Sequence, residues 1–244
     1  MRYIRISDSP CDVADCPAVF SDRENDRRAI VRCDLLPPTE EITLEEQEAA
    51  VGLPALHLIA AAAELGGGLT RVDYTRMFRL FAADAFRIET RDYYDVAAEK
   101  PAIAEFEATG QIVNYPDKQR WLDQLVSNTA AGRTIRRVHT VHASRLSSYL
   151  RWEFASQVAT SVPAGEDIRI ADLDRHPELA IDTDVWIFDD AVGVKMWQHT
   201  EADGVRGVAR ATDAEMDAYR AWQNDALRVA VPLPEFLDRI GKAA

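Results

Sequence analysis

The chain has 244 residues, of which 47% are hydrophobic, and it carries a net charge of −13 at pH 7. That length and composition can fill the core of one large domain, or of one domain with a small appendage. The negative charge opposes binding to a nucleic-acid backbone, and the lack of a run of roughly eighteen apolar residues opposes a membrane span. Because the first residues also lack the apolar stretch of a secretory signal, we expect a cytoplasmic protein.

The first 64 residues differ from the rest in charge, since they hold six basic and thirteen acidic side chains. Possible strands at 2–6 and 29–33 enclose a turn-rich stretch, and a helix-favouring stretch ends in the alanine-rich residues 56–65. The glycines at 66–68 indicate a helix stop and a linker, because a phosphate-binding loop would follow a strand instead. The sequence therefore predicts a small acidic α+β segment at 1–65, a linker at 66–69 and an α/β domain at 70–244.

The three cysteines all lie in the first 33 residues. Cys11 and Cys16 are further apart than the close pairs that hold structural zinc, and a zinc site would need His57 without a second close pair to support it. The sequence also contains no Gly-x-Ser-x-Gly elbow of the kind that holds a nucleophilic serine. We expect free thiols, no metal and no cofactor.

Periodicity predicts alternating helices and strands from residue 70 onward. A helix that carries Tyr74, Met77 and Phe81 precedes a strand at 86–91 in which apolar and charged residues alternate. Helices at 101–110 and around 121–132 each end at a glycine, and a strand at 134–141 follows. A helix from Ser144, strands at 168–170, 185–188 and 193–197, and two closing helices complete the chain. The pattern is typical of an α/β fold with a mixed sheet of about five to six strands flanked by helices.

Two pairs of residues carry side chains of the kind that bind metal ions. His139 and His142 lie three apart on an extended chain, so their side chains should face opposite sides of the strand. Asp189 and Asp190 stand between two strands, which favours a hairpin turn over a divalent-ion site. Neither pair supports a metal centre.

The helix expected from Ser144 carries Arg145, Tyr149 and Glu153 four residues apart, so that they would share one stripe. Such a stripe could bind an anion through Arg145 or Arg151 while Glu153 orients the anion or takes a proton. The more common role, which we favour, is a ladder of salt bridges and hydrogen bonds that fixes the helix on the sheet.

Five segments of the second region resemble an uncharacterised actinobacterial domain family. They are FRIETRDYY at 86–94, IRRV at 135–138, YLRWE at 149–153, AGEDIR at 164–169 and VWIFD at 185–189. The family is often encoded beside, or fused to, helix-turn-helix regulators of the Xre type, which implies a regulatory setting. Residues 15–31 are similar to a small actinobacterial protein of the same gene neighbourhoods, except that Cys33-Asp34 stand where glycine is expected.

The order of these segments is also similar to the phospholipase D-like fold, with an arginine-bearing strand, an Ile-Arg-Ile strand and an apolar strand that ends in aspartate. Catalysis in that superfamily uses a histidine followed two residues later by lysine. None of the five histidines here has a lysine at that position. The resemblance therefore implies the fold without a phosphohistidine mechanism.

These observations lead to two hypotheses. We expect a non-enzymatic regulatory or signalling protein that binds a helix-turn-helix regulator, another protein or a small anionic ligand, and that contacts neither DNA nor membranes directly. The candidate binding residues are Arg87, Arg91, Arg136, Arg137, Tyr149, Arg151 and Arg169. The alternative is an enzyme acting on a phosphate ester or nucleotide, with Glu153 and Glu166 as acid–base residues and arginines that stabilise charge.

Overall fold

The computed structural model describes residues 3–8, 18–22, 25–32, 69, 71–198 and 205–241. The chain divides into two compact units, Met1–Asp73 and Tyr74–Ala244, and each is described by itself. The cysteines, the alanine-rich helix expected near residue 60 and the glycine linker lie outside the described residues. The domain boundaries expected from the sequence therefore stay predictions.

The described part of the first unit contains a three-stranded antiparallel sheet in the order β1-β2-β3. Its strands are β1 (Tyr3–Asp8), β2 (Ala18–Asp22) and β3 (Asn25–Arg32). β1 overlaps the strand expected at 2–6, and β3 overlaps the strand expected at 29–33 but begins earlier, at Asn25, whereas β2 was not predicted. β2 is the central strand and pairs with both others.

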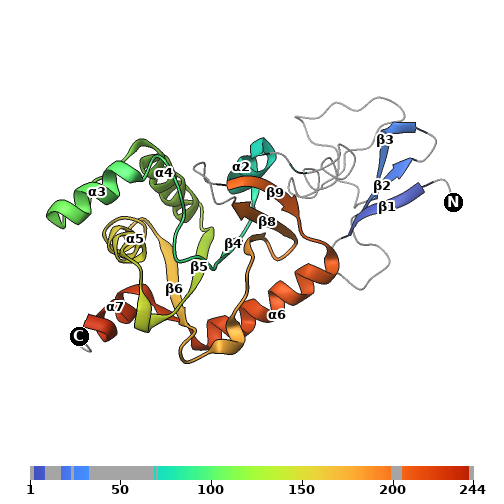
Figure 1. The fold of residues 1–244 in the computed structure, drawn as a ribbon. Coiled ribbons are helices and arrows are strands. Elements are labelled where there is room, and N and C mark those ends of the chain that lie inside the picture. Colours follow the sequence, from blue (N-terminus) through green and yellow to red (C-terminus); the bar gives the residue numbers. More distant parts are fainter. Residues whose placement is uncertain are drawn as a thin grey trace. The chain divides into compact units, whose positions relative to one another are not determined.

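The second unit is built on a mixed sheet that has seven strands among the described residues, in the order β10-β6-β5-β4-β7-β8-β9 (Figure 1). The three strands β4, β5 and β6 are parallel, and the remaining pairings are antiparallel. The strands are β4 (Asp84–Glu89), β5 (Thr134–Val141), β6 (Glu166–Asp172), β7 (Asp184–Phe188), β8 (Val192–Gln198), β9 (Val205–Arg210) and β10 (Val231–Pro232). The expected α/β class with a mixed sheet is confirmed, and β9 and the short β10 are the strands that the sequence analysis missed.

Helices lie on both faces of this sheet, with α6 on one side and α3, α4 and α5 on the other (Figure 1). The helices are α2 (Arg71–Leu80), α3 (Lys100–Thr109), α4 (Pro116–Ala130), α5 (Ser148–Ala159), α6 (Asp213–Val229) and α7 (Leu233–Gly241), with short 3-10 turns at Ala143–Arg145 and Pro177–Leu179. None of the helices in the described residues is long and apolar enough to cross a membrane.

Local sequence explains where most of these helices begin and end. Gly110 closes α3 in the left-handed conformation, at the position where the sequence predicted a helix end. Ser147 caps α5 by accepting a hydrogen bond from the backbone N–H of Leu150. Thr212 and Glu215 form a capping box at the start of α6.

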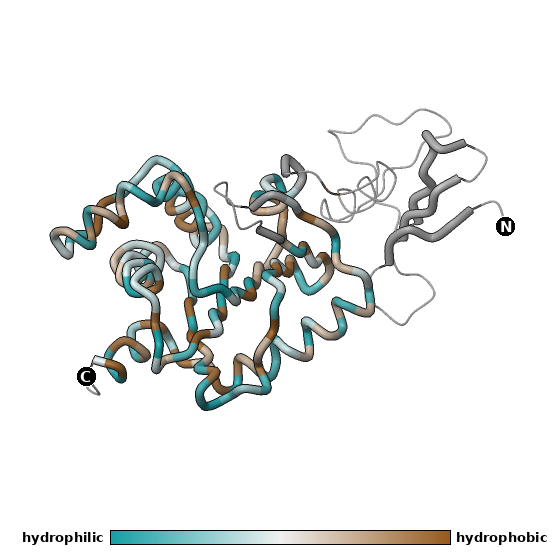
Figure 2. The backbone as a smooth tube through the Cα atoms, viewed as in Figure 1, coloured by the Kyte–Doolittle hydropathy of each residue, from teal (hydrophilic) through white to brown (hydrophobic). Residues whose placement is uncertain are grey.

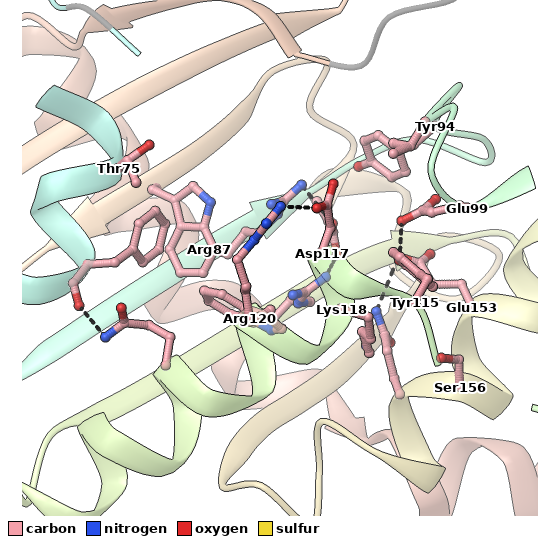
Figure 3. Close-up of a pocket in the computed structure, with 18 of the residues that line it drawn as sticks. Thr75, Arg87, Tyr94, Glu99, Tyr115, Asp117, Lys118, Arg120, Glu153 and Ser156 are labelled. Atoms are coloured by element: carbon pink, nitrogen blue, oxygen red, sulfur yellow. Dashed lines mark hydrogen bonds and ion pairs between the residues drawn. The ribbon is translucent and has the colours of Figure 1, made fainter. Parts of the chain in front are cut away.

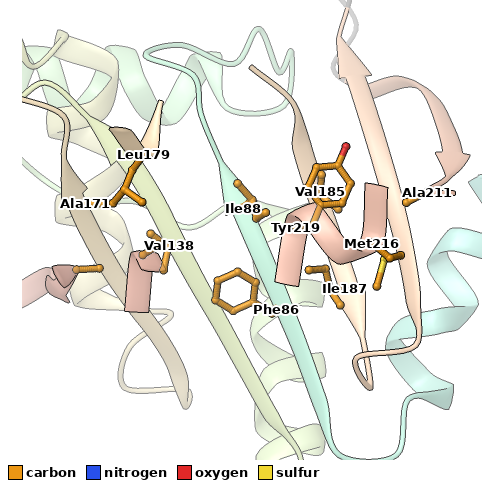
Figure 4. Packing of buried hydrophobic residues seen from close by; sticks show 12 residues of the cluster. Phe86, Ile88, Val138, Ala171, Leu179, Val185, Ile187, Ala211, Met216 and Tyr219 are labelled. Carbon is orange, nitrogen blue, oxygen red and sulfur yellow. The ribbon is translucent and has the colours of Figure 1, made fainter. Parts of the chain in front are cut away.

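The face of the sheet under α6 is apolar and forms one core of the unit (Figure 4). Successive strand residues point to opposite faces, so Phe86 and Ile88 of β4 enter this core, whereas Arg87 and Glu89 lie on the other face. Hydrophobic residues (brown) and hydrophilic residues (teal) are accordingly interspersed along the sheet in Figure 2. A Cβ at Gly193 would collide with the side chain of Met216, which shows how closely α6 approaches β8. The core residues include Phe86, Ile88, Val138, Val185, Ile187, Met216 and Tyr219.

Two predicted placements need correction. Arg145 lies in the 3-10 turn that precedes α5, so it does not share a helical stripe with Tyr149 and Glu153. The cause is Ser147, whose capping hydrogen bond starts the helix at Ser148. β4 ends at Glu89, so Arg91 lies beyond the strand on which it was expected to alternate with Arg87 and Glu89.

The predicted hairpin at Asp189 and Asp190 is confirmed, because both residues have positive φ angles between β7 and β8. The carboxylate of Asp189 also accepts hydrogen bonds from the backbone N–H groups of Ala82, Ala83 and Asp84. This turn therefore holds the start of β4 in place.

Candidate functional site

A cavity of about 500 Å³ lies on the face of the sheet opposite α6. Its walls come from β4, β5 and β7 and from helices α2, α4 and α5 (Figure 3). Sites for small molecules typically enclose ~300–1,000 Å³, so the cavity can hold one. Its exposed rim carries Thr75, Arg79, Asp117 and Arg120, whereas its inner wall is largely buried.

The inner wall is ionic because charged residues of adjacent strands project from the same face. Arg87 of β4 is in register with Arg137 of β5 and with Trp186 of β7. Two residues further along β4, Glu89 is in register with His139 of β5. Side chains two apart on a strand point the same way, so these groups meet at one side of the sheet.

Glu89 is the centre of this ionic network. Its Oε1 lies 2.7 Å from Nη2 of Arg87, and its Oε2 lies 2.6 Å from Nη1 of Arg137. The Glu89 side chain is only 3% exposed. Burial by itself would raise the pKa of Glu89, but Arg137 and Arg87 outweigh that effect and lower the pKa to about 2. Glu89 is therefore ionised.

Arg137 is shared between Glu89 and Glu166. Its Nε and Nη2 donate to Oε1 of Glu166 at 2.9 and 2.6 Å. The other Glu166 oxygen accepts from Nε1 of Trp121 at 3.2 Å. Because every one of these groups is buried or partly buried, the contacts replace hydration that the charges have lost.

Arg87 also contacts a second carboxylate, that of Asp184 on the neighbouring antiparallel strand β7. Oδ2 of Asp184 accepts from the hydroxyl of Tyr94 at 2.8 Å and lies 3.5 Å from Nη2 of Arg87. The other oxygen accepts from the backbone and hydroxyl of Thr90. The guanidinium of Arg87 also lies over the ring of Trp186, with 5.5 Å from its central carbon to the ring centroid.

Helix α5 presents Tyr149, Glu153 and Gln157 to the cavity at intervals of four residues. Nε2 of Gln157 donates to Oε1 of Glu153 at 3.2 Å. Oε2 of Glu153 has no hydrogen-bond partner within the described part of the chain. Burial, and then the negative charge of Glu89, raise the pKa of Glu153 well above its usual value, although Arg137 partly opposes them. The two carboxyl groups are thus shifted in opposite directions, so that Glu153 favours its protonated form and Glu89 its ionised form.

His139 lies behind these two carboxylates and is fully buried. Its Nδ1 is 3.6 Å from Oε2 of Glu89 and 3.9 Å from Oε2 of Glu153. Nε2 is 2.9 Å from the carbonyl oxygen of Arg91, which can only accept. Burial lowers the pKa of His139, so the ring is neutral and carries its proton on Nε2.

Glu99 joins the helices around the mouth. Its two carboxylate oxygens accept from the hydroxyls of Tyr115 and Tyr149, each at 2.9 Å. Burial raises the pKa of Glu99, while the two hydroxyl bonds act in the opposite direction. The contact ties the segments before α3 and α4 to α5.

The cations nearest the opening are Lys118, Arg120 and Arg79. Lys118 donates to the hydroxyl of Ser161, and its pKa is lowered by burial. Arg120 pairs with Asp117 on the first turn of α4, and both side chains are exposed (Figure 3). The opening thus carries three cations against the carboxyl groups of Asp117 and Glu99. The inner wall is less positive, because its two arginines are set against Glu89, Glu166 and Asp184.

Of the predicted binding residues, Arg87, Arg137 and Tyr149 line the cavity together with Glu153. Glu166 does not line it, because the carboxylate is held by Arg137 and Trp121. The other predicted residues lie elsewhere: Arg136 pairs with Asp84, Arg169 pairs with Asp167, Arg151 is exposed on α5, and Arg91 follows β4.

Sequence reasoning missed several lining residues. Gln157 could have been predicted from the sequence, because this residue continues the spacing of Tyr149 and Glu153 by one more helical turn. Glu99 and Trp186 carried no signal, since each reaches the cavity through tertiary contacts with distant segments.

The fold and the cavity define an α/β domain with a buried ionic pocket walled by aromatic side chains. The chain belongs to a family described as a domain of unknown function, DUF6879, whose match covers residues 72–238. No curated protein matches the chain.

Proposed function

We propose that residues 74–241 form a binding module for a small molecule, which is held in the cavity between the sheet and helices α2, α4 and α5. The observation that carries this proposal is the set of polar atoms left without a partner on the cavity wall. Within the described residues, these atoms are Oε2 of Glu153, Oε1 of Gln157, Nε1 of Trp152, Nε1 of Trp186 and Nε of Arg87.

Such atoms are costly in an apolar core, where each buried polar group without a partner destabilises the fold by roughly 1–3 kcal/mol. All five belong to residues that line one cavity large enough for a ligand. A bound molecule that satisfies them would recover that free energy, and this supports binding over a purely structural role for the ionic network.

A purely anionic ligand, as expected from the arginine-rich sequence, is less well supported at the inner wall. Arg87 and Arg137 are already neutralised there by Glu89, Glu166 and Asp184. An anionic group fits better near the opening, beside Lys118 and Arg120. A ligand with an anionic outer end and an uncharged or cationic inner end is compatible with both regions.

The proposal that ligand binding has a regulatory purpose rests on the sequence resemblance to proteins encoded beside helix-turn-helix regulators. In that setting the module would report the presence of a metabolite to a partner protein.

A second candidate is an enzyme that acts on a phosphate ester or nucleotide. It is favoured by one observation, the raised pKa of Glu153, since a protonated carboxyl in a cavity can act as a general acid. Glu166 is less suited to the role of its partner, because Arg137 and Trp121 occupy its oxygens. Absence of turnover for phosphomonoesters and nucleotides by a purified protein that binds them would leave the binding module as the better account.

The test is a melting-temperature screen with nucleotides, amino acids, amines, organic acids and sugar phosphates. Thr75→Trp places a large ring at the rim, and Asp123→Trp places the same ring on an exposed position of α4 that does not line the cavity. We expect at least one compound class to raise the melting temperature of the wild type and Asp123→Trp, but not of Thr75→Trp. The proposal fails if no class does so at millimolar concentration.

A further inference from the structure

Three groups converge at the inner end of the cavity, and once Glu153 is ionised they present only acceptor atoms to one another. Oε2 of Glu153 and Nδ1 of His139 are 3.9 Å apart, and Oε2 of Glu89 lies 3.6 Å from the same nitrogen. Of these atoms, Oε2 of Glu153 and Nδ1 of His139 have no hydrogen-bond partner in the described segments of the chain.

Neighbouring contacts leave His139 and Gln157 each with one free acceptor atom. His139 uses its Nε2–H on the carbonyl of Arg91, so Nδ1 of the neutral ring offers a lone pair. Gln157 uses its amide N–H on Oε1 of Glu153, so its own Oε1 is left as an acceptor. Gln157 is 3% exposed and lines the cavity.

The charge balance also favours a donor at this point. Two guanidinium groups, Arg87 and Arg137, are set against the three carboxylates Glu89, Glu166 and Asp184. Ionisation of Glu153 would add a further negative charge. Lys118 near the opening supplies a third positive charge, so one cation placed beside ionised Glu153 would complete the balance of charge.

Aromatic rings surround the same point. The rings of Tyr149 and Trp152 are 5.5 Å apart between centroids, and those of Tyr94 and Tyr149 are 6.2 Å apart. All three residues line the cavity and are almost fully buried. Flat walls of this kind pack against a flat ligand, and their faces attract a cation.

We propose that the ligand of this cavity carries a protonated amino or amidino group on a flat ring, and that this group donates hydrogen bonds to Glu153 and Gln157. The inference rests on the proposed binding function and names the chemistry of the ligand's inner end. Glu153 provides the charged contact, Gln157 provides the neutral one, and the aromatic residues enclose the ring.

Three probes of one size separate the possibilities: benzamidinium, benzamide and benzoate carry a cationic, a neutral and an anionic group on the same ring. Their binding to the full chain is measured by calorimetry at neutral pH. The variants are Glu153→Gln, which keeps the shape of the side chain, and Glu107→Gln, a matched change on the exposed face of α3. Near-ultraviolet circular dichroism confirms that each variant is folded.

We expect benzamidinium to bind at least about tenfold more tightly than benzamide or benzoate, as a charge-assisted hydrogen bond implies. Glu153→Gln should remove that preference, and Glu107→Gln should keep it. Gln157→Met, which removes the second acceptor at similar volume, should weaken benzamidinium binding and leave benzoate unchanged.

The inference is overturned if benzoate or benzamide binds as well as benzamidinium, if Glu153→Gln retains the preference, or if no probe binds. In each case the melting-temperature screen with Thr75→Trp tests separately whether the cavity binds a small molecule. A hit in that screen from a ligand without a donor group would keep the binding module and reject this ligand class.

Discussion

Oε2 of Glu153 lies 3.9 Å from Nδ1 of His139, and neither atom has a hydrogen-bond partner among the residues that the structure describes. Glu153 lines the cavity and His139 lies behind it, whereas the other charges of the inner wall are paired, with Glu89 held between Arg87 and Arg137. The ion pairs are formed within the protein, whereas Glu153 and His139 each keep one atom without a hydrogen-bond partner. This contrast supports a ligand site, because in a purely structural network the buried polar atoms would be expected to bond to one another.

Replacement of Glu153 by Gln should stabilise the protein at neutral and higher pH. The pKa of Glu153 is raised in the folded state, so its contribution to stability is fully present below its usual pKa and is lost as the pH rises through the folded value. Glutamine resembles the protonated acid and does not ionise. We expect a gain of about 1 kcal/mol or more in the free energy of unfolding near pH 8, because a buried charged acceptor without a hydrogen-bond partner costs at least that much.

Urea unfolding of wild type and Glu153→Gln as a function of pH measures this difference. The groups around Glu153 that titrate or carry charge are Arg87 and Glu89 of β4, Arg137 and His139 of β5, Lys118 of α4, Tyr149 of α5, and Tyr94, Glu99 and Tyr115 in the connecting segments. A wild-type curve parallel to that of the variant from acid to alkaline pH would contradict the prediction.

Glu89 should have the opposite effect on the pH dependence of stability, and this effect should be seen at acid pH. Its folded pKa is lowered to about 2 from an ordinary value of 4.5, so its stabilisation is present above 4.5 and is lost as the pH falls toward 2. Glu89→Gln should remove this part of the acid sensitivity. It should also destabilise the protein at neutral pH by about 3 kcal/mol or more, because two buried arginines lose their shared partner.

The same unfolding measurement on Glu107→Gln is the control, since Glu107 is exposed. If Glu89→Gln were no less stable than that control at neutral pH, Glu89 would not hold the network together.

Arg137→Met should destabilise the fold by about 3–5 kcal/mol, because the change leaves buried carboxylates of Glu89 and Glu166 without their common donor. Arg151→Met makes the same chemical change at an exposed position of α5 and should alter stability by less than about 0.5 kcal/mol. Thermal or chemical unfolding distinguishes the two. Equal effects at both positions would remove the argument for a buried ionic core.

Asp189→Ala should lower the free energy of unfolding by about 2 kcal/mol or more, because the carboxylate accepts three backbone hydrogen bonds and the residue adopts a positive φ angle. Asp189→Asn should cost less, because asparagine tolerates that backbone conformation and retains one acceptor oxygen. Unfolding curves that rank Asn below Ala in stability would be inconsistent with this role of the turn.

The order of helices and strands could be predicted from the sequence where local signals were strong. β4 showed its alternation of apolar and charged residues, and α3 ended at the expected Gly110. The start of α5 was misplaced because the apolar spacing extends past the cap at Ser147, so that periodicity alone did not locate the boundary.

The pairing of charges could not be predicted in the same way. Arg137 meets Glu89 and Glu166 because β5 lies between β4 and β6, and strand order is a tertiary property. Arg87 and Arg137, which the sequence suggested as anion-binding residues, are therefore neutralised by carboxylates that strand pairing brings beside them. Glu153 could be found from its spacing, but its lack of a partner depends on the packing around His139.

The central claim is that Glu153 is neutral in the free cavity and becomes a charged partner of a donor ligand. Calorimetry of benzamidinium binding near neutral pH, in two buffers that differ in ionisation enthalpy, counts the protons released. The account predicts release of about one proton per bound probe in the wild type and none in Glu153→Gln. Binding heats that do not depend on the buffer in the wild type would contradict it.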